Sequence, residues 1–112
     1  MDIIVAGVGK VGYTVAAQLC AEGHSVTVID RLPERIELVS STLDVSAICG
    51  DVDIETLKLA GASRAELLIA VMDSDEANIL CCMTARKLGV KQTAARSRRT
   101  TTDTWSRTGR RA

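Results

Sequence analysis

The feature that most constrains the fold lies in the first dozen residues, where an apolar run leads directly into a glycine-rich turn. Residues Ile3–Ala6 are apolar, and the sequence Gly7-Val-Gly-Lys-Val-Gly12 follows at once. In and beyond this turn, apolar residues recur every four positions, at Val11, Val15 and Leu19, which is the period of a helix. The pattern therefore predicts a buried strand, a tight turn and a helix, in that order.

The three glycines are spaced G-x-G-x-x-G, a pattern that is informative only when a strand precedes it and a helix follows. Gly7 permits the turn out of the strand, Gly9 lets a pyrophosphate approach the backbone, and Gly12 lets the helix pack closely on the sheet. The free N–H groups at the start of the helix then face the phosphates. Glycines at such spacing also arise by chance in turns, so the pattern needs independent support.

That support comes from a second strand, predicted at about residues 25–30, which ends in a carboxylate. Asp30 lies 18 residues beyond Gly12, where a dinucleotide-binding βαβ unit has the acid that binds the ribose. Asp30 could instead be a solvated carboxylate at a strand end. Its position behind the glycine turn favours ribose binding.

Strands and helices alternate in the same way to about residue 90. Further strands are expected at about 45–49 and 67–71, with a marginal fifth strand at 90–95. The helix before that fifth strand has a predicted buried face of Ala77, Leu80, Cys81, Thr84 and Leu88. A βαβ series folds as a parallel sheet with right-handed crossovers. We therefore predict an α/β, Rossmann-type doubly wound sheet of strand order 3-2-1-4-5, which could stop short of a sixth strand.

Composition limits the classes of function. The chain has 112 residues, enough for one domain. Its net charge of zero combines an acidic part, residues 1–90 with 7 basic and 13 acidic side chains, and a basic part, residues 91–112 with 7 and 1. The acidic part argues against binding of nucleic acid there. The longest apolar run has six residues, far below the roughly 20 that span a bilayer, so we expect a cytoplasmic chain without membrane insertion.

The last twenty residues differ from the rest. Residues 93–112 include six Thr and six Arg, and no Val, Ile, Leu, Met or Phe follows Val90. Such a segment buries too little apolar surface to offset the entropy of ordering it. We therefore expect a domain at residues 1–92 and a disordered basic tail at 93–112. An altered reading frame, or binding of nucleic acid or acidic lipid, are alternative explanations of this tail.

The four cysteines show no C-x-x-C spacing. They are Cys20, Cys49, Cys81 and Cys82. The last two point about 100° apart on a helix and cannot easily hold one metal ion. We expect reduced, small core residues, with redox sensing as the alternative.

Four stretches of this sequence resemble the N-terminal lobe of the RCK (KTN) family, and within it the nucleotide-binding subunits of Trk-type potassium uptake systems. They are residues 3–13, 23–30, 47–51 and 68–78. The first is shared by all Rossmann-type proteins, whereas Asp73-Ser-Asp-Glu-Ala-Asn78 is far more specific to this family. The resemblance covers about residues 1–92. It implies a regulatory function, a membrane-embedded potassium transporter or channel as partner, a homo-oligomer in the full-length form, and a location peripheral to the inner membrane.

The resemblance also implies a nucleotide site in distinct parts. Phosphate contacts come from the backbone of the turn and the helix start, which comprise Gly7, Val8, Gly9, Lys10, Val11 and Gly12. The other contacts come from strand ends: Asp30 and Arg31 at the ribose, Gly50 and Asp51 at the adenine, and Met72 and Asp73 on the far side of the cleft. The ligands of the family are NAD(H) or ATP and ADP, and the residues leave this choice open.

An alternative from a different class is the cofactor-binding fragment of an NAD-dependent dehydrogenase. A dehydrogenase needs a general acid or base within reach of the reacting group. The one histidine, His24, is predicted in the turn before the second strand, away from the cofactor, and no Ser-x-x-x-Tyr-x-x-x-Lys pattern is present. We therefore predict a protein that binds a nucleotide without transforming it. A Rossmann-type domain without any cofactor is a third interpretation.

Overall fold

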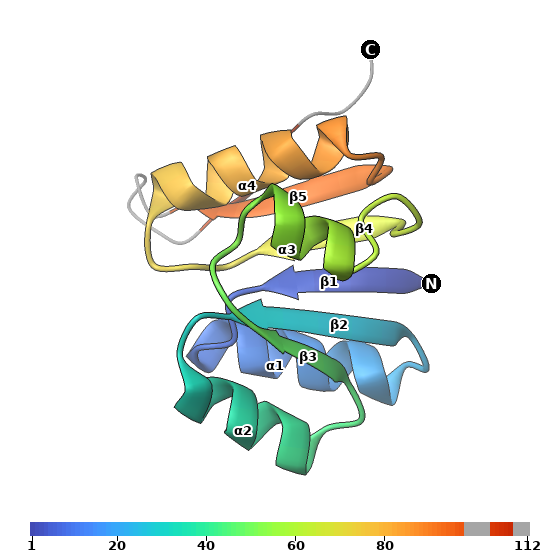
Figure 1. Cartoon of the computed structure of the whole chain (residues 1–112), viewed down its shortest axis with the longest axis vertical. Helices are drawn as coiled ribbons and strands as arrows, with labels where there is room; N and C mark the ends of the chain where they lie inside the picture. The colour runs from blue at the N-terminus through green and yellow to red at the C-terminus, as the bar shows by residue number, and fades with distance from the viewer. Residues whose placement is uncertain (98–103, 109–112) are drawn as a thin grey trace.

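The strands form one sheet with the predicted order at its centre. The computed structural model describes residues 1–97 and the backbone of residues 104–108 (Figure 1). In this part of the chain the sheet has the order β3-β2-β1-β4-β5-β6. Its strands are β1 (Asp2–Ala6), β2 (Ser25–Asp30), β3 (Ser46–Cys49), β4 (Leu67–Ala70), β5 (Gln92–Ser97) and β6 (Thr104–Thr108). The first five are parallel, which confirms the order 3-2-1-4-5, and β6 runs antiparallel to β5.

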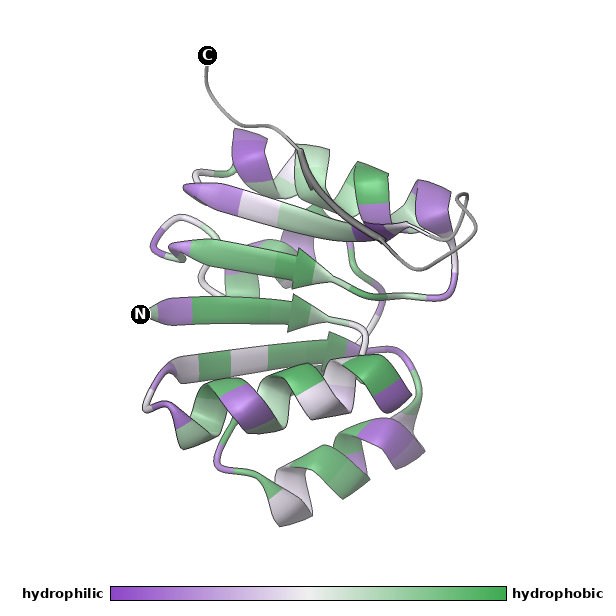
Figure 2. Cartoon of the chain, turned by 180° about the vertical axis from the view of Figure 1, so that it is seen from behind, coloured by the Kyte–Doolittle hydropathy of each residue, from purple (hydrophilic) through white to green (hydrophobic). Residues whose placement is uncertain are grey.

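Two pairs of helices cover the two faces of the sheet. They are α1 (Lys10–Ala21), α2 (Pro33–Thr42), α3 (Ile54–Leu59) and α4 (Asp75–Lys87). Figure 1 shows α3 and α4 in front of the sheet, and α1 and α2 lie on the other side, nearest the viewer in Figure 2. No helix in the described residues is long and apolar enough to cross a membrane.

Strand β1 is the centre of the core, and its side chains alternate between the two helix layers. Ile3 and Val5 pack with Ala16 and Val39 on the side of α1 and α2, whereas Ile4 packs on the side of α3 and α4. A parallel strand covered on both faces needs apolar residues at consecutive positions. Figure 2 shows the central strands coloured hydrophobic almost throughout, so the run that opens the sequence is explained by its place in the sheet.

The carboxyl ends of β1, β2 and β4 meet at one edge. Ala6 is aligned with Ile29 of β2 and with Ala70 of β4. From β1 the chain continues to β2 on one side, and β4 is added on the other. This reversal of the strand order leaves a crevice outside the carboxyl ends of the strands, where ligands of open α/β sheets bind.

The predicted buried face of α4 is wrong in part. Leu80 is 62% exposed. The buried residues of the helix are Asn78, Cys81, Cys82 and Ala85. The helix is rotated so that Asn78 faces inward, where its side chain bonds the backbone of Met72 and Arg96. Small residues then fill the space against the sheet, and the larger Leu80 lies outside.

Part of the segment predicted to be a disordered tail forms strands. Residues 93–97 belong to β5, and residues 104–108 pair with them as β6. The sheet therefore continues beyond the fifth strand, where the prediction allowed it to stop. Thr93, Ala95 and Arg96 are buried, and Ala95 belongs to the core cluster on the side of α3 and α4. The remaining residues of the predicted tail, 98–103 and 109–112, lie outside the described residues.

Candidate functional site

The glycine turn is required by close packing. Gly7 has φ +98°, and a Cβ atom there would lie 3.0 Å from the carbonyl oxygen of Val71. A Cβ atom on Gly12 would overlap the carbonyl oxygen of Gly7. Since Gly7 N–H also donates to the carbonyl oxygen of Ile29 at 2.8 Å, the turn is fixed between the ends of β2 and β4.

Helix α1 begins at this turn without a side-chain cap. Its N-cap residue is Gly9, no side chain bonds the cap, and the first turn contains no acidic residue. The first N–H groups of a helix have no partner within the helix, and together with the helix dipole they favour an anion. The start of α1 is therefore an electropositive backbone surface. Lys10 adds an exposed positive side chain beside it.

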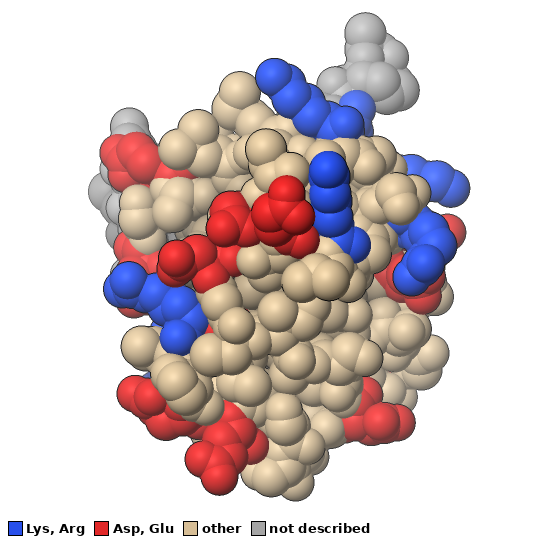
Figure 3. Space-filling view, viewed as in Figure 1, with Lys and Arg blue, Asp and Glu red and all other residues tan. Residues whose placement is uncertain are grey.

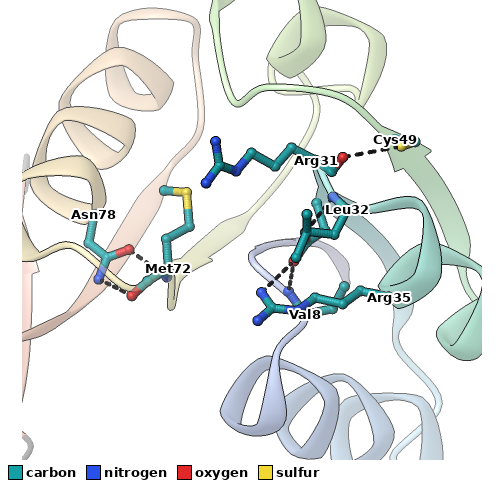
Figure 4. A network of polar contacts seen from close by, with 8 residues as sticks. Val8, Arg31, Leu32, Arg35, Cys49, Met72 and Asn78 are labelled. Atoms are coloured by element: carbon teal, nitrogen blue, oxygen red, sulfur yellow. Dashed lines mark hydrogen bonds and ion pairs between the residues drawn. The ribbon is translucent and has the colours of Figure 1, made fainter.

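The Asp30 carboxylate links the glycine turn to the start of α2. Its Oδ2 accepts the Val8 N–H at 2.9 Å and its Oδ1 accepts the Leu32 N–H at 2.9 Å. The Arg35 guanidinium lies 3.4 Å from Oδ2. Figure 4 shows Val8, Leu32 and Arg35, the three residues that make these contacts, close together. Asp30 is only 5% exposed, so it is a fixed acceptor at the end of β2 and not a solvated strand end.

A cavity of about 230 Å³ opens at this edge of the sheet. Its lining comprises Gly7, Ile29, Asp30, Arg31, Arg35, Gly50, Asp51, Val52, Met72, Asp73, Ser74 and Ala77. The structure thus brings together the predicted residues at all the strand ends. The other predicted phosphate contacts, Val8, Gly9, Lys10, Val11 and Gly12, lie in the adjoining turn and the first turn of α1 and do not line this cavity.

The cleft carries charges of both signs. Figure 3 shows acidic and basic side chains close together at the left of the molecule, the side toward which the strands of Figure 1 point. In Figure 4 the Arg31 side chain extends into the cleft on the side of Met72. Asp51 and Asp73 are exposed on the lining. Such a mixed lining suits a ligand that has phosphate groups at one end and hydroxyl and amine donors at the other.

The far wall of the cleft is held by a buried amide. Asn78 Oδ1 accepts the Met72 N–H at 2.7 Å, and Asn78 Nδ2 donates to the carbonyl oxygens of Met72 at 3.2 Å and Arg96 at 3.0 Å. Ser74 caps α4 by accepting the Ala77 N–H at 3.2 Å. The backbone of Met72, just beyond the end of β4, is therefore held at both its N–H and its carbonyl oxygen.

Sequence reasoning missed Arg35 and Asn78. Asn78 is part of the stretch that carries the family resemblance, yet no role was predicted for its side chain. Arg35 lies in the first turn of α2, five positions after Asp30. Its closeness in the sequence to the end of β2 was the available signal that it lies near the cleft.

The cysteines divide into two classes. All four are free. Cys81 and Cys82 are buried, and burial together with the neighbouring Cys82 raises the pKa of the Cys81 thiol to about 12, so these two are core residues as predicted. Cys49 is exposed and Cys20 is partly exposed, which corrects the prediction for Cys49. Its Sγ lies 3.6 Å from the carbonyl oxygen of Arg31, because β3 is an edge strand and ends beside the cleft.

The parallel order, the glycine turn and the cleft at the strand reversal define a Rossmann-type α/β domain. The model of the TrkA-N domain family matches residues 3–107, and the chain belongs to this family. It is 36% identical over 97 residues to "Trk system potassium uptake protein TrkA homolog" of Methanothermobacter thermautotrophicus, a match that covers 86% of this chain and 45% of that protein. The resemblance to the RCK family of Trk systems is thereby confirmed. The relatives are named as potassium uptake proteins and not as enzymes.

Two solved structures share the fold. The chain superposes on a Kef C-terminal domain of Shewanella denitrificans in its AMP-bound form with a TM-score of 0.65 and 27% identity, over 78% of this chain and 52% of that one. It superposes on the GsuK channel bound to NAD with a TM-score of 0.73 and 21% identity, over 84% of this chain and 17% of that one. The chain spans less than half the length of the curated relatives that it matches.

Proposed function

We propose that this chain is the nucleotide-binding domain of a regulatory subunit of a Trk-type potassium transport system, and that it binds NAD(H), ATP or ADP in the cleft without transforming it. The observation that carries the proposal is the position of Asp30, a buried carboxylate held beside the glycine turn and the uncapped start of α1. Family membership supports potassium transport, because the curated relatives are named for it. The two superposed structures support an adenine nucleotide, since one is bound to AMP and the other to NAD.

The proposed ligand lies across the carboxyl ends of the strands. Its phosphates contact the backbone from Gly7 to Gly12, where donors and the helix dipole favour an anion. The ribose hydroxyls bond Asp30, with Arg31 beside them. Gly50 and Asp51 border the adenine. Met72 and Asp73 line the opposite wall, where a nicotinamide or a further phosphate would lie.

The proposed device works by binding alone. A ligand shifts a conformational equilibrium only as far as its affinities for the two conformations differ, and that difference is the free energy of coupling to the partner. No step in such a mechanism needs proton transfer. Within the described residues, the one histidine supports this: His24 Nδ1 lies 3.5 Å from the amino group of Met1, at the amino edge of the sheet and away from the cleft.

The partner in this proposal is a membrane-embedded potassium transporter or channel subunit. The full-length subunit would form a homo-oligomer on the cytoplasmic side of the inner membrane, without membrane insertion of its own. These statements rest on the names of the relatives and on family membership. Nucleic acid is not a proposed partner, because residues 1–90 are acidic overall.

The proposal is tested first by identifying the ligand. We expect native mass spectrometry of the purified chain to find a co-purified adenine nucleotide, and calorimetry to show saturable binding of NADH, ATP or ADP. Incubation with NADH and candidate hydroxy or keto acids should leave the absorbance of NADH unchanged. Potassium flux through a reconstituted Trk-type system should respond to nucleotide when a full-length subunit is present. Oxidation of NADH that depends on a substrate would favour the dehydrogenase alternative instead.

A further inference from the structure

The Arg35 side chain lies between the two halves of the proposed site. Its Nη1 is 3.4 Å from Oδ2 of Asp30, the carboxylate that is proposed to bind the ribose. Its Cζ is 3.4 Å from the position that a Cβ atom on Gly9 would occupy, so the guanidinium also lies against the phosphate-binding turn. In Figure 4 the guanidinium of Arg35 is next to Val8, within that turn. One cation thus reaches both the carboxylate and the predicted position of the phosphates.

Arg35 also occupies part of the acceptor capacity of Asp30. A carboxylate has about four acceptor sites, two on each oxygen. Backbone N–H groups of Val8 and Leu32 use one site on each oxygen. Arg35 takes the second site on Oδ2. A ribose that enters the cleft therefore finds a free site on Oδ1 and has to displace the guanidinium to reach the second site.

The pair can separate easily. The Arg35 side chain is 37% exposed whereas Asp30 is 5% exposed, so the guanidinium can leave toward solvent while the carboxylate keeps its two backbone donors. A guanidinium binds phosphate through two parallel hydrogen bonds, which are stronger than a single contact with a carboxylate oxygen at 3.4 Å. Since Gly9 has no side chain, nothing at that position separates the guanidinium from a phosphate bound to the turn.

We propose that Arg35 changes its partner when an adenine nucleotide binds: in the free protein it pairs with Asp30, and in the complex it pairs with the phosphate nearest the glycine turn. This inference rests on the proposed nucleotide-binding function and adds a determinant of specificity to it. A nucleotide offers the displaced guanidinium a new anion, whereas a nucleoside offers none. The site therefore selects adenosine 5′-phosphates over adenosine through Arg35, the residue that pairs with Asp30 in the free protein.

The test compares adenosine, AMP and ADP by calorimetry, with adenosine measured by competition against ADP. We expect the parent chain to bind AMP at least tenfold more tightly than adenosine. Arg35→Ala should weaken the binding of AMP by about tenfold or more, because each lost charge-assisted hydrogen bond to the phosphate accounts for about that factor. The same variant should bind adenosine equally well or more tightly, because Asp30 is freed. Arg35→Lys keeps the charge without the planar fork and should retain part of the preference. The decisive quantity is the ratio of the affinity for AMP to the affinity for adenosine in each variant.

Arg64→Ala is the matched control. Arg64 is exposed and lies at the opposite, amino edge of the sheet beside Asp2 and Ser25, so its loss changes the net charge equally without touching the cleft. We expect this variant to keep the parent ratio. If Arg35→Ala weakens adenosine and AMP by the same factor, Arg35 is only a structural neighbour of Asp30 and the inference is wrong. If the parent binds none of NADH, ATP, ADP and AMP, the proposed function is itself overturned, and this inference with it.

Discussion

Replacing Asp30 tests whether this carboxylate is part of the fold, of the site, or of both. In Asp30→Ala the N–H groups of Val8 and Leu32 lose their acceptor. The Val8 bond is buried and the Leu32 bond is partly buried, so water replaces the second more readily than the first. The alanine side chain leaves space beside the turn but supplies no acceptor.

The magnitude follows from these two bonds. A buried donor without a partner costs about 1–3 kcal/mol, and a partly buried donor that reaches water costs less. Loss of the ion pair between Asp30 and Arg35 adds little, because the Arg35 side chain is 37% exposed and water can solvate it. We therefore expect Asp30→Ala to lower the free energy of unfolding by about 2–4 kcal/mol, a large part of the roughly 5–15 kcal/mol that domains possess.

Urea denaturation followed by circular dichroism measures this loss. The dependence of the free energy of unfolding on urea should be unchanged, because the surface exposed on unfolding is the same. Arg35→Ala is the control, since it removes the ion pair and leaves both N–H groups paired. A loss below about 0.5 kcal/mol for Asp30→Ala, the size of an ordinary surface substitution, would refute the assignment of these two bonds as structural.

Nucleotide binding by the same variant separates the two roles. At urea-free conditions where Asp30→Ala remains folded, we expect the affinity for nucleotide to fall by about 1.5–3 kcal/mol, the range for hydrogen bonds to a charged group. NADP should bind less well than NAD, because its 2′-phosphate would meet the Asp30 carboxylate, although Arg31 reduces that penalty. Equal affinity of variant and parent in calorimetry would remove Asp30 from the site while leaving its structural role intact.

Three further predictions concern substitutions in the elements around the cleft. In urea denaturation, Gly12→Ala should lower the free energy of unfolding by about 1–3 kcal/mol, the usual cost of overpacking, because its Cβ would overlap the carbonyl oxygen of Gly7. An unchanged free energy of unfolding would mean that α1 shifts freely. Asn78→Ala should lower the free energy of unfolding by about 2–4 kcal/mol, because buried hydrogen bonds are lost. Leu80→Ala, on the exposed side of the same helix, should lower it by under about 1 kcal/mol. A backbone N–H in the first turn of α3 lowers the pKa of Asp53 below its usual 3.8, so this cap stabilises the fold above that pH and is lost as the pH falls through the lowered value. Asp53→Asn should flatten that part of the acid dependence.

The elements that were predictable are those whose signal is local in the sequence. Four consecutive apolar residues, the glycine spacing and a carboxylate 18 residues further on depend on neighbours within one βαβ unit. For this reason β1, the turn, α1 and the position of Asp30 could be placed without a structure. The parallel sheet followed from the alternation of strands and helices, and the order 3-2-1-4-5 followed from the dinucleotide-binding motif at the end of the first strand.

The missed features depend on partners that are distant in the sequence or that belong to the backbone. Asn78 faces inward because it bonds the carbonyl oxygen of Arg96 on another strand, and no periodicity of apolar residues reveals that acceptor. Strand β6 pairs with β5 through backbone hydrogen bonds, which polar residues form as readily as apolar ones. Arg35 reaches the glycine turn only because α2 begins immediately after the end of β2. The roles predicted for the site residues toward a nucleotide stay predictions.

The buried side-chain amide of Asn78 connects the cleft to the edge of the sheet. Asn78 bonds both the N–H and the carbonyl oxygen of Met72, on the cleft wall, and also the carbonyl oxygen of Arg96 in β5. A displacement of Met72 by a ligand would therefore strain a bond to β5, the strand that β6 joins. Because one amide makes all three bonds, they cannot be altered independently. The regulatory function that we propose needs a link between the ligand and a surface that a partner contacts, and Asn78→Ala is the variant that tests this amide in that role.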